Sequence, residues 1–387
     1  MRIAGRKEAG NLQKIEILRA SKSCSRESGK YEGESMRVEK GKVRAPEIGR
    51  VWLNSTPLSF RQLRGRVVLV DFWDYTCVNC IRTLPYVQAW HERYRDKGLT
   101  VIGVHTPEFT FAQYESNVER GIREFGLTYP IVIDSNREIW KAFANRYWPT
   151  KYLLDKDGYL RYGHFGEGGY GECELVIQEL LREINPALDL PALMEPLREE
   201  DHVGAVCYRA SGELYLGNQR GRIGNEGGFK EDQIADYEFS GKPEENFFYA
   251  AGRWASTAEY FEAAESGSHR LRLKFEAVAV NLVMASPHAT SAEVTILQDG
   301  KPLTRNQATR DTRFRPSPNG GAEEGYVVVD AARMYFLVDN HDFGEHELEL
   351  RCSTGIAAFA FTFTSCVDPV ASALQTAGVP ELDGSKL

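Results

Sequence analysis

The chain has 387 residues, of which 42% are hydrophobic and 26% are charged, and its formal net charge is −8. This length predicts two domains, because one hydrophobic core rarely extends over so many residues. The composition is typical of a globular protein, and the acidic balance argues against a nucleic-acid-binding protein. The sequence contains no apolar stretch long enough to predict a transmembrane helix.

Residues 1–46 are polar and charged and show few periodic apolar positions, which predicts a tail. The segment has no apolar central stretch like that of a secretory signal peptide. The sequence as given therefore predicts a cytoplasmic protein. Two interpretations of the segment stay open: a disordered tail, or an extension upstream of a true start at Met36.

Residues 47–187 alternate between apolar segments typical of buried strands and segments with the spacing of amphipathic helices. The alternation ends in a hairpin, marked by the turn Asp157-Gly158, and a closing helix. This order predicts an α/β sheet with helices on both faces. The expected strands are 66–73, 99–106, 129–134 and the hairpin 150–166, and the expected helices are 80–98, 111–126, 137–147 and 171–184.

Residues 188–203 contain prolines and several acidic residues and are predicted to link two domains. Over residues 204–370, short segments of alternating apolar and polar residues follow one another, separated by Gly, Asn and Asp turns. This pattern predicts an antiparallel β-sandwich, and residues 371–387 are predicted to be a tail. The expected strands are 212–217, 269–277, 278–285, 292–303, 324–330, 333–339, 346–352 and 356–364.

Cys77-Val-Asn-Cys80 follows an apolar strand and opens a helix. At a helix N-terminus, free backbone N–H groups and the helix dipole favour a thiolate, so the setting predicts a lowered pKa for Cys77. A thiol one turn further on can attack a mixed disulfide and release the partner. The motif predicts a redox-active pair in which Cys77 is the nucleophile and Cys80 resolves. A zinc site needs a second close Cys or His pair, which the sequence lacks, so no metal and no cofactor besides this disulfide is expected.

The other five cysteines are scattered and odd in number, so they do not predict a disulfide framework. In an extended strand, Cys366 would end some 30 Å (about 3.3 Å per residue) from the turn beside Cys352, which excludes a bridge within that hairpin. We expect all five to be small unpaired residues. They are Cys24, Cys173, Cys207, Cys352 and Cys366.

Two further features accompany the cysteines. Asp71 lies six residues before Cys77 in an otherwise apolar strand, where an acidic residue is costly unless it has a task. A buried carboxyl with a raised pKa can accept the proton of Cys80 when that thiol attacks. Trp148-Pro149 precedes the hairpin strand, and a cis peptide bond there would let the backbone approach the cysteines.

The segment VDFWDYTCVNC, with Pro85 and the later Trp148-Pro149-Thr150, resembles thioredoxin motif by motif. The expected helix at 111–126 resembles the TlpA/ResA branch of that superfamily. The runs DFWDYTCVNCIRTLPYV, VIGVHTPEF, NRYWPTKYLLD and HFGEG resemble the soluble C-terminal part of DipZ-type proteins. The resemblance covers about 45–370 and implies a thioredoxin-like domain followed by a sandwich similar to carbohydrate-binding modules.

This resemblance implies a thiol–disulfide oxidoreductase that acts on protein thiols and disulfides. Glu108, in GVHTPEF, falls where ResA-like proteins place a glutamate in the active-site cavity. It is expected to tune proton transfer together with Asp71. The match to thioredoxin also implies that four residues contact the substrate. These are Trp73, Trp148, Pro149 and Thr150.

The resemblance also suggests partners and a location. DipZ-type proteins carry a membrane electron-transfer domain that is not seen in this sequence, so the reductant is expected to be a separate protein, a thioredoxin reductase or a CcdA/DsbD-type donor. The sandwich is expected to be a recognition module for a glycan or for a protein. ResA and TlpA relatives are exported, which makes an extracytoplasmic location the alternative to the cytoplasm.

Two other functions are compatible with this type of fold. A peroxidase of the peroxiredoxin kind shares this fold, but it needs Thr or Ser three residues before the reactive cysteine and Pro seven residues before it. Asp74 and Val70 occupy these two positions before Cys77, which disfavours a peroxidase. A glycan- or partner-binding protein with a secondary redox domain is disfavoured by the intact pair with Asp71 and Pro149. Three aromatic residues could stack on a sugar, although positions in the core or at its rim are more typical. They are Tyr249, Trp254 and Tyr260.

Overall fold

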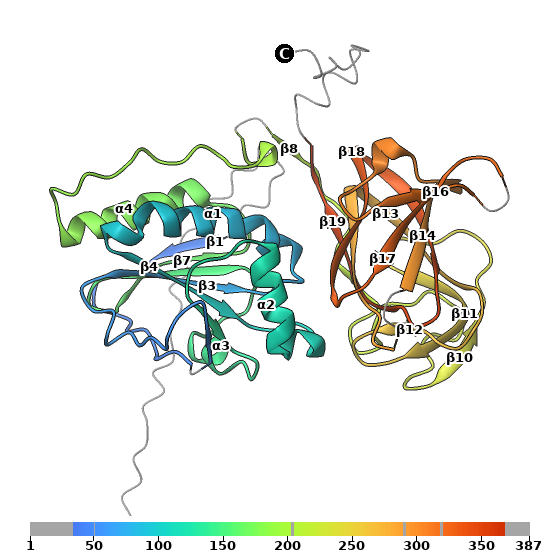
Figure 1. The fold of residues 1–387 in the computed structure, drawn as a ribbon, viewed down its shortest axis with the longest axis horizontal. Coiled ribbons are helices and arrows are strands. Elements are labelled where there is room, and N and C mark those ends of the chain that lie inside the picture. The colour runs from blue at the N-terminus through green and yellow to red at the C-terminus, as the bar shows by residue number, and fades with distance from the viewer. Residues whose placement is uncertain (1–33, 50, 203–204, 289–291, 318–319, 368–387) are drawn as a thin grey trace, which may run out of the picture.

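The computed structural model describes residues 34–49, 51–202, 205–288, 292–317 and 320–367. An α/β unit and a strand-rich unit lie side by side (Figure 1). The expected C-terminal tail and the first 33 residues lie outside the described residues. Within the described residues, no helix has the length and apolar character needed to cross a membrane.

The α/β unit is built on one mixed sheet with the strand order β1-β7-β6-β3-β4-β5-β2. Neighbours β3, β4 and β5 run parallel, and the other pairs are antiparallel. Every residue of the central strand β3 is buried, because helices cover both faces. The strands are β1 (Glu34–Arg37), β2 (Trp52–Leu53), β3 (Val67–Trp73), β4 (Leu99–His105), β5 (Ile131–Ile133), β6 (Thr150–Leu154) and β7 (Leu160–Phe165).

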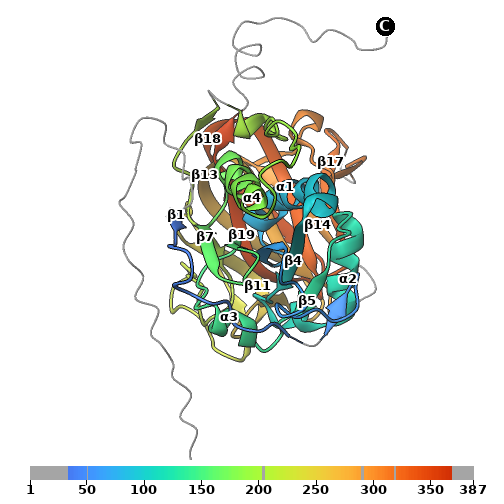
Figure 2. The ribbon, with the colours of Figure 1, turned by 90° about the vertical axis from the view of Figure 1, so that its left-hand side faces the viewer.

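Four helices cover this sheet. The apolar side chains of α1 (Val78–Tyr94), α2 (Glu115–Glu124) and α4 (Tyr170–Ile184) join one core cluster, and those of α3 (Glu138–Ala142) join another. In Figure 2 the unit lies in front of the strand-rich unit, with α1 and α4 above the sheet. The helices predicted from spacing are all present. The third is shorter than expected, because Ala144 takes a left-handed φ of 50°.

Part of the expected N-terminal tail belongs to this sheet. β1 pairs with β7 from Glu34↔Phe165 to Arg37↔Tyr162, and the next residue continues the contact through its backbone N–H. The prediction of a tail up to residue 46 is therefore wrong for the described residues 34–46. A short edge strand gives little sequence signal, since Met36 is its one large apolar side chain.

The predicted linker packs along the α/β unit. The backbone N–H of Met194 donates to Glu174 Oε2 at 2.8 Å, and that of Leu197 donates to the Tyr86 hydroxyl at 2.8 Å. These bonds hold the segment against α1 and α4. The described part of the linker is thus bound to the surface of the α/β unit.

The strand-rich unit is an antiparallel sandwich formed by one large sheet that wraps around a core, with a separate two-stranded sheet of β8 and β20. Its two longest strands, β13 and β18, pair along most of their length. Its strands are β8 (Val206–Cys207), β9 (Leu214–Tyr215), β10 (Ile234–Tyr237), β11 (Phe248–Ser256), β12 (Phe261–Ala263), β13 (His269–Ala285), β14 (Ala292–Gln298), β15 (Lys301–Pro302), β16 (Arg313–Arg315), β17 (Glu324–Val329), β18 (Arg333–Cys352), β19 (Ala357–Thr364) and β20 (Cys366–Val367).

Two pairs of expected strands are each one continuous strand. The segments predicted as 269–277 and 278–285 form β13, and those predicted as 333–339 and 346–352 form β18. The register jumps from Ala277↔Gly344 to Ala279↔Asp339, so the turn-like residues between positions 339 and 344 form a bulge instead of reversing the chain.

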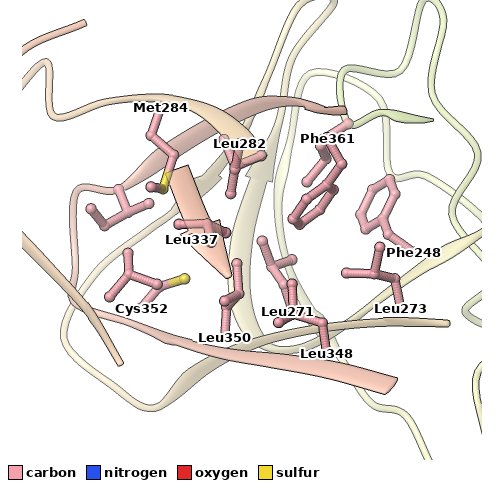
Figure 3. Close-up of a cluster of buried hydrophobic side chains, with 14 of the residues drawn as sticks. Phe248, Leu271, Leu273, Leu282, Met284, Leu337, Leu348, Leu350, Cys352 and Phe361 are labelled. Carbon is pink, nitrogen blue, oxygen red and sulfur yellow. The ribbon is translucent and has the colours of Figure 1, made fainter. Parts of the chain in front are cut away.

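The sandwich core consists of side chains that point inward from the strands of the wrapped sheet. Figure 3 shows Leu271 and Leu282 of β13 with Leu337 and Leu350 of β18, all fully buried. The aromatic residues considered for sugar stacking are not free surface groups. Trp254 and Tyr249 are buried, and Tyr260 packs on Phe359.

Cys207 and Cys366 form a disulfide with an S–S distance of 2.02 Å. They lie opposite each other in the β8–β20 pair. The prediction that these two cysteines are unpaired is therefore wrong, because 159 residues of sequence separate two strands that the fold brings together. Cys173 and Cys352 are free and buried, as expected, and Cys24 lies outside the described residues.

Candidate active site

Cys77 and Cys80 lie where the central strand meets α1. β3 ends at Trp73, and Cys77 is the N-cap of α1, with extended backbone angles. The backbone N–H of Cys80 donates to Cys77 Sγ at 3.2 Å. Both side chains are free thiols; Cys77 is half-buried and Cys80 is fully buried. The predicted placement of the first thiol at a helix N-terminus is confirmed.

The electrostatic surroundings of Cys77 differ from the simple expectation. Burial raises the pKa of the Cys77 thiol and outweighs the hydrogen bonds from Cys80, which lower it. The charges of Glu108 and Asp74 raise this pKa further. The lowering of the Cys77 pKa predicted from the helix N-terminus is thus overcome by burial. Burial also raises the pKa of Cys80 well above its ordinary value.

Asp71 is fully buried in β3, as the sequence predicts. Burial raises its pKa to about 7, and the charge of Lys151, its direct neighbour on β6, acts in the opposite direction. Neither carboxyl oxygen has a hydrogen-bond partner among the described residues. The charge of Asp71 in turn raises the pKa of Cys80, so the two groups interact. A carboxyl that titrates near neutral pH is suited to exchange protons with a buried thiol.

Lys151 was missed by the sequence analysis. It is fully buried, and its ammonium group lies 5.5 Å from the centre of the Tyr170 ring and 3.3 Å from the Gly166 carbonyl oxygen. The available signal was a single lysine within the apolar run that follows Pro149. A buried cation beside Asp71 limits how far the carboxyl pKa rises.

Asp74 was also missed as a site residue. Its Oδ1 accepts hydrogen bonds from the backbone N–H and the hydroxyl of Thr76, and its Oδ2 accepts one from the backbone N–H of Glu108 at 2.6 Å. The side chain is fully buried. Asp74 therefore ties the loop before Cys77 to the loop that carries Glu108.

Glu108 lies beside the thiol pair, close enough for its charge to raise the pKa of Cys77. Its side chain is 10% exposed. Its Oε1 accepts hydrogen bonds from the Tyr215 hydroxyl at 2.8 Å and from Arg220 Nη1 at 2.9 Å. Burial raises the pKa of Glu108, and Arg220 lowers it. Both partners come from the strand-rich unit, more than 100 residues away in the sequence.

The Trp148–Pro149 peptide bond is cis, as predicted. Thr150 pairs with Phe72, so this bond lies at the end of β3 that leads to Cys77. Among the residues assigned to substrate contact, Trp148 is half-buried, whereas Pro149 and Thr150 are buried. Trp73 is fully buried against His105, which places it in the core and does not support direct substrate contact.

An apolar cluster joins the two units directly beside Cys77. Phe359 of β19 is its centre, with its ring centroid 5.1 Å from that of Phe109 and 4.8 Å from that of Phe111. We name the buried members the interdomain cluster. They are Val78 and Phe109 from the α/β unit, and Val283, Ala285, Met334, Ala357, Phe359 and Ala360 from the sandwich.

Polar contacts surround the interdomain cluster. Arg82 Nη2 donates to the Thr364 hydroxyl at 2.6 Å, and the backbone N–H of Thr110 donates to Glu259 Oε2 at 3.0 Å. Arg310 pairs with Glu124 at 3.2 Å. The sandwich face that packs here is therefore occupied by the α/β unit and is not open to a ligand.

Comparison with known proteins agrees with this architecture. Residues 43–163 match the AhpC/TSA family, and residues 211–364 match the thioredoxin-like C-terminal domain family. The protein DipZ of Mycobacterium tuberculosis is 33% identical over 327 residues, which cover 82% of this chain and 42% of DipZ. The chain thus spans less than half the length of that relative.

Two shorter relatives match the α/β unit. The thiol–disulfide oxidoreductase YkuV of Bacillus subtilis is 32% identical over 122 residues, which cover 32% of this chain and 80% of YkuV. The thiol–disulfide oxidoreductase ResA of Bacillus thuringiensis is 27% identical over 158 residues, which cover 40% of this chain and 86% of ResA. Together with the cis-proline, the helix-terminal thiol pair and the sheet order, these matches show that the chain belongs to the thioredoxin superfamily, among the ResA- and DipZ-like proteins.

Proposed function

We propose that the chain exchanges disulfides with protein partners through Cys77 and Cys80. The observation that carries this proposal is the pair of free thiols at the N-terminus of α1, with Asp71 in electrostatic contact with the second one. Cys77 is the more accessible sulfur and accepts the Cys80 N–H, so it is suited to attack. Cys80 is fully buried and is suited to resolve.

The reaction then runs in two steps. The Cys77 thiolate attacks one sulfur of the partner disulfide, the S–S bond breaks, and the leaving sulfur takes up a proton. Cys80 next gives its proton to Asp71 and attacks Cys77 Sγ, which releases the second partner thiol. The partner gains two electrons and two protons, and the protein holds a Cys77–Cys80 disulfide. A separate dithiol protein, which is also part of the proposal, restores the thiols.

Reduction of insulin disulfides tests this function. We expect the wild-type protein to catalyse it with dithiothreitol as the electron source, and Cys77→Ser to lose activity to the uncatalysed level, because the other described free thiols are all buried. Cys352→Ala is the control, since this free cysteine lies in the sandwich core. An inactive wild type, or an active Cys77→Ser variant, would overturn the proposal.

A thiol peroxidase is the second candidate, because residues 43–163 match the AhpC/TSA family. The residues around Cys77 argue against it. Asp74 stands where that chemistry needs Thr or Ser, and its carboxylate accepts three hydrogen bonds instead of donating one. Consumption of hydrogen peroxide in the same assay mixture distinguishes the two, and peroxide turnover faster than insulin reduction would favour the peroxidase.

An extracytoplasmic location is part of this proposal. The disulfide between Cys207 and Cys366 supports it, because such bonds persist mainly in oxidising compartments. Mass spectrometry of protein alkylated inside cells tests it, and full labelling of both cysteines would contradict it. A glycan ligand for the sandwich remains a proposal carried by family resemblance alone, and binding of the full chain to a glycan array tests it.

A further inference from the structure

The strand-rich unit contributes polar side chains to the redox site. β9 and the loop that follows it lie over the loop that carries Glu108. Arg220 stacks on the Tyr215 ring, with 3.7 Å between its guanidinium carbon and the ring centre, and lies 5.5 Å from the centre of the Phe109 ring. The two side chains thus support each other, and both reach Glu108 Oε1.

We propose that Tyr215 and Arg220 of the sandwich are positioning residues of the redox site, which fix the orientation and charge of Glu108 beside Cys77. This inference deepens the proposed function and rests on it. By this inference, the sandwich contributes residues to the active site, in addition to any role in recognition. Two hydrogen bonds to one carboxylate oxygen hold this side chain at 10% exposure.

The charges around Glu108 explain why it needs the contacts with Tyr215 and Arg220. Asp74 lies under the same loop, and its negative charge, like that of Glu213, opposes a second carboxylate there. Arg220 is the cation in direct contact with Glu108, and Arg137 donates to the carbonyl oxygen of the residue before it. Without Arg220, none of the described residues would place a positive charge in contact with Glu108.

Tyr215 links two carboxyl groups. Its hydroxyl lies 2.8 Å from Glu108 Oε1 and 2.6 Å from Glu213 Oε2. A phenol has one hydrogen to donate, so both short contacts are satisfied together when one carboxyl group carries a proton. Desolvation and the charge on Glu108 raise the pKa of Glu213. Because Glu213 is the more exposed of the two carboxyl groups and can exchange a proton with solvent, it is the one suited to hold that proton.

The test is the pH dependence of Cys77 alkylation by iodoacetamide in the full chain, followed by mass spectrometry of the Cys77 peptide. We expect Arg220→Met and Tyr215→Phe each to raise the alkylation midpoint by about half a pH unit or more, because the Glu108 charge is then less well neutralised where the thiol ionises. Glu108→Gln should lower the midpoint. In a Glu108→Gln background, the other two substitutions should have little further effect.

Two interface variants are matched controls. Arg310→Met removes the interdomain ion pair with Glu124, and Tyr260→Phe alters a phenol packed on Phe359. Neither contacts Glu108, so neither should move the midpoint. The inference would be overturned if Arg220→Met and Tyr215→Phe left the alkylation midpoint unchanged. It would also be overturned if they shifted the midpoint as much in the Glu108→Gln background as in the wild type. Alkylation requires no disulfide substrate, so it reports on the surroundings of Cys77 independently of insulin reduction. A wild type that fails to reduce insulin would count against the proposed function, whereas the alkylation midpoints test the roles of Tyr215 and Arg220.

Discussion

Replacing Asp71 with asparagine is expected to raise the free energy of unfolding at pH 8 by about 2–4 kcal/mol and to leave it nearly unchanged at pH 4. The reason is the burial of a carboxyl with a pKa of about 7 in the folded protein against an ordinary value of 3.8. Between these values the folded state binds more protons than the unfolded state. Stability contributed by the protonated carboxyl is therefore present below pH 4 and is lost as pH rises to 7.

Urea unfolding of both proteins at the two pH values measures this effect. The pKa of about 7 already includes the opposing charge of Lys151. Asparagine removes the negative charge that raises the pKa of the buried Lys151, which is why we expect less than the full value for three pKa units. Asp96→Asn, at a 91% exposed side chain, is the control and should show no gain. A gain of the same size at both pH values would show that Asp71 does not titrate in the folded state.

The same substitution separates stability from function. We expect Asp71→Asn to lose on the order of 10²-fold in insulin reduction, because Cys80 then has no carboxylate to take its proton. The loss should be largest near neutral pH and should shrink at alkaline pH, where hydroxide removes the proton. A variant that is both more stable and as active as the wild type would remove Asp71 from the proton transfer.

Phe359→Ala is expected to loosen the contact between the two units and expose Cys77. Phe359 is 4% exposed; it touches Phe109 and Phe111 across the interface and Tyr260 within the sandwich. Truncating a buried phenylalanine to alanine lowers the stability of a protein by about 3–5 kcal/mol. Here we expect most of this loss to weaken the packing between the two units. Relief of burial should lower the Cys77 pKa and raise its alkylation rate at pH 8 by about 10-fold, the effect of one pKa unit.

A neighbouring substitution is the control for this effect. Phe363 lies on the same strand but packs on Phe275 in the sandwich. Phe363→Ala should destabilise the sandwich without changing Cys77 alkylation. If the two variants expose Cys77 equally, the sandwich does not shield the thiol through the interdomain cluster.

Local patterns in the sequence predicted the centre of the site. Cys77, Cys80 and Asp71 lie within ten residues, and their strand-to-helix setting determines their environment. The cis bond before Pro149 was also predicted, because it lies in the segment Trp148-Pro149-Thr150 that resembles thioredoxin. Apart from the short edge strands β1 and β2, the strands and helices of the α/β unit follow from regular apolar spacing, which is why their order was predicted correctly.

Long-range pairing explains the features that the sequence did not predict. Tyr215 and Arg220 reach Glu108 through a contact between units, and no spacing pattern marks a residue whose partner lies more than 100 positions away. The bond between Cys207 and Cys366 depends on the pairing of two short strands in the same way. Burial also reverses the expected direction of the Cys77 pKa, since helix geometry alone contains no information about what covers the thiol.

Trapping of a mixed disulfide tests most directly whether Cys77 attacks and Cys80 resolves. The Cys80→Ser and Cys77→Ser variants are each incubated with a peptide disulfide, quenched with acid and mapped by mass spectrometry. We expect the Cys80→Ser variant to accumulate a peptide adduct on Cys77, because nothing remains to release it. The Cys77→Ser variant should form little or none, because Cys80 is fully buried. An adduct on Cys80 in the second variant, with none on Cys77 in the first, would contradict this assignment.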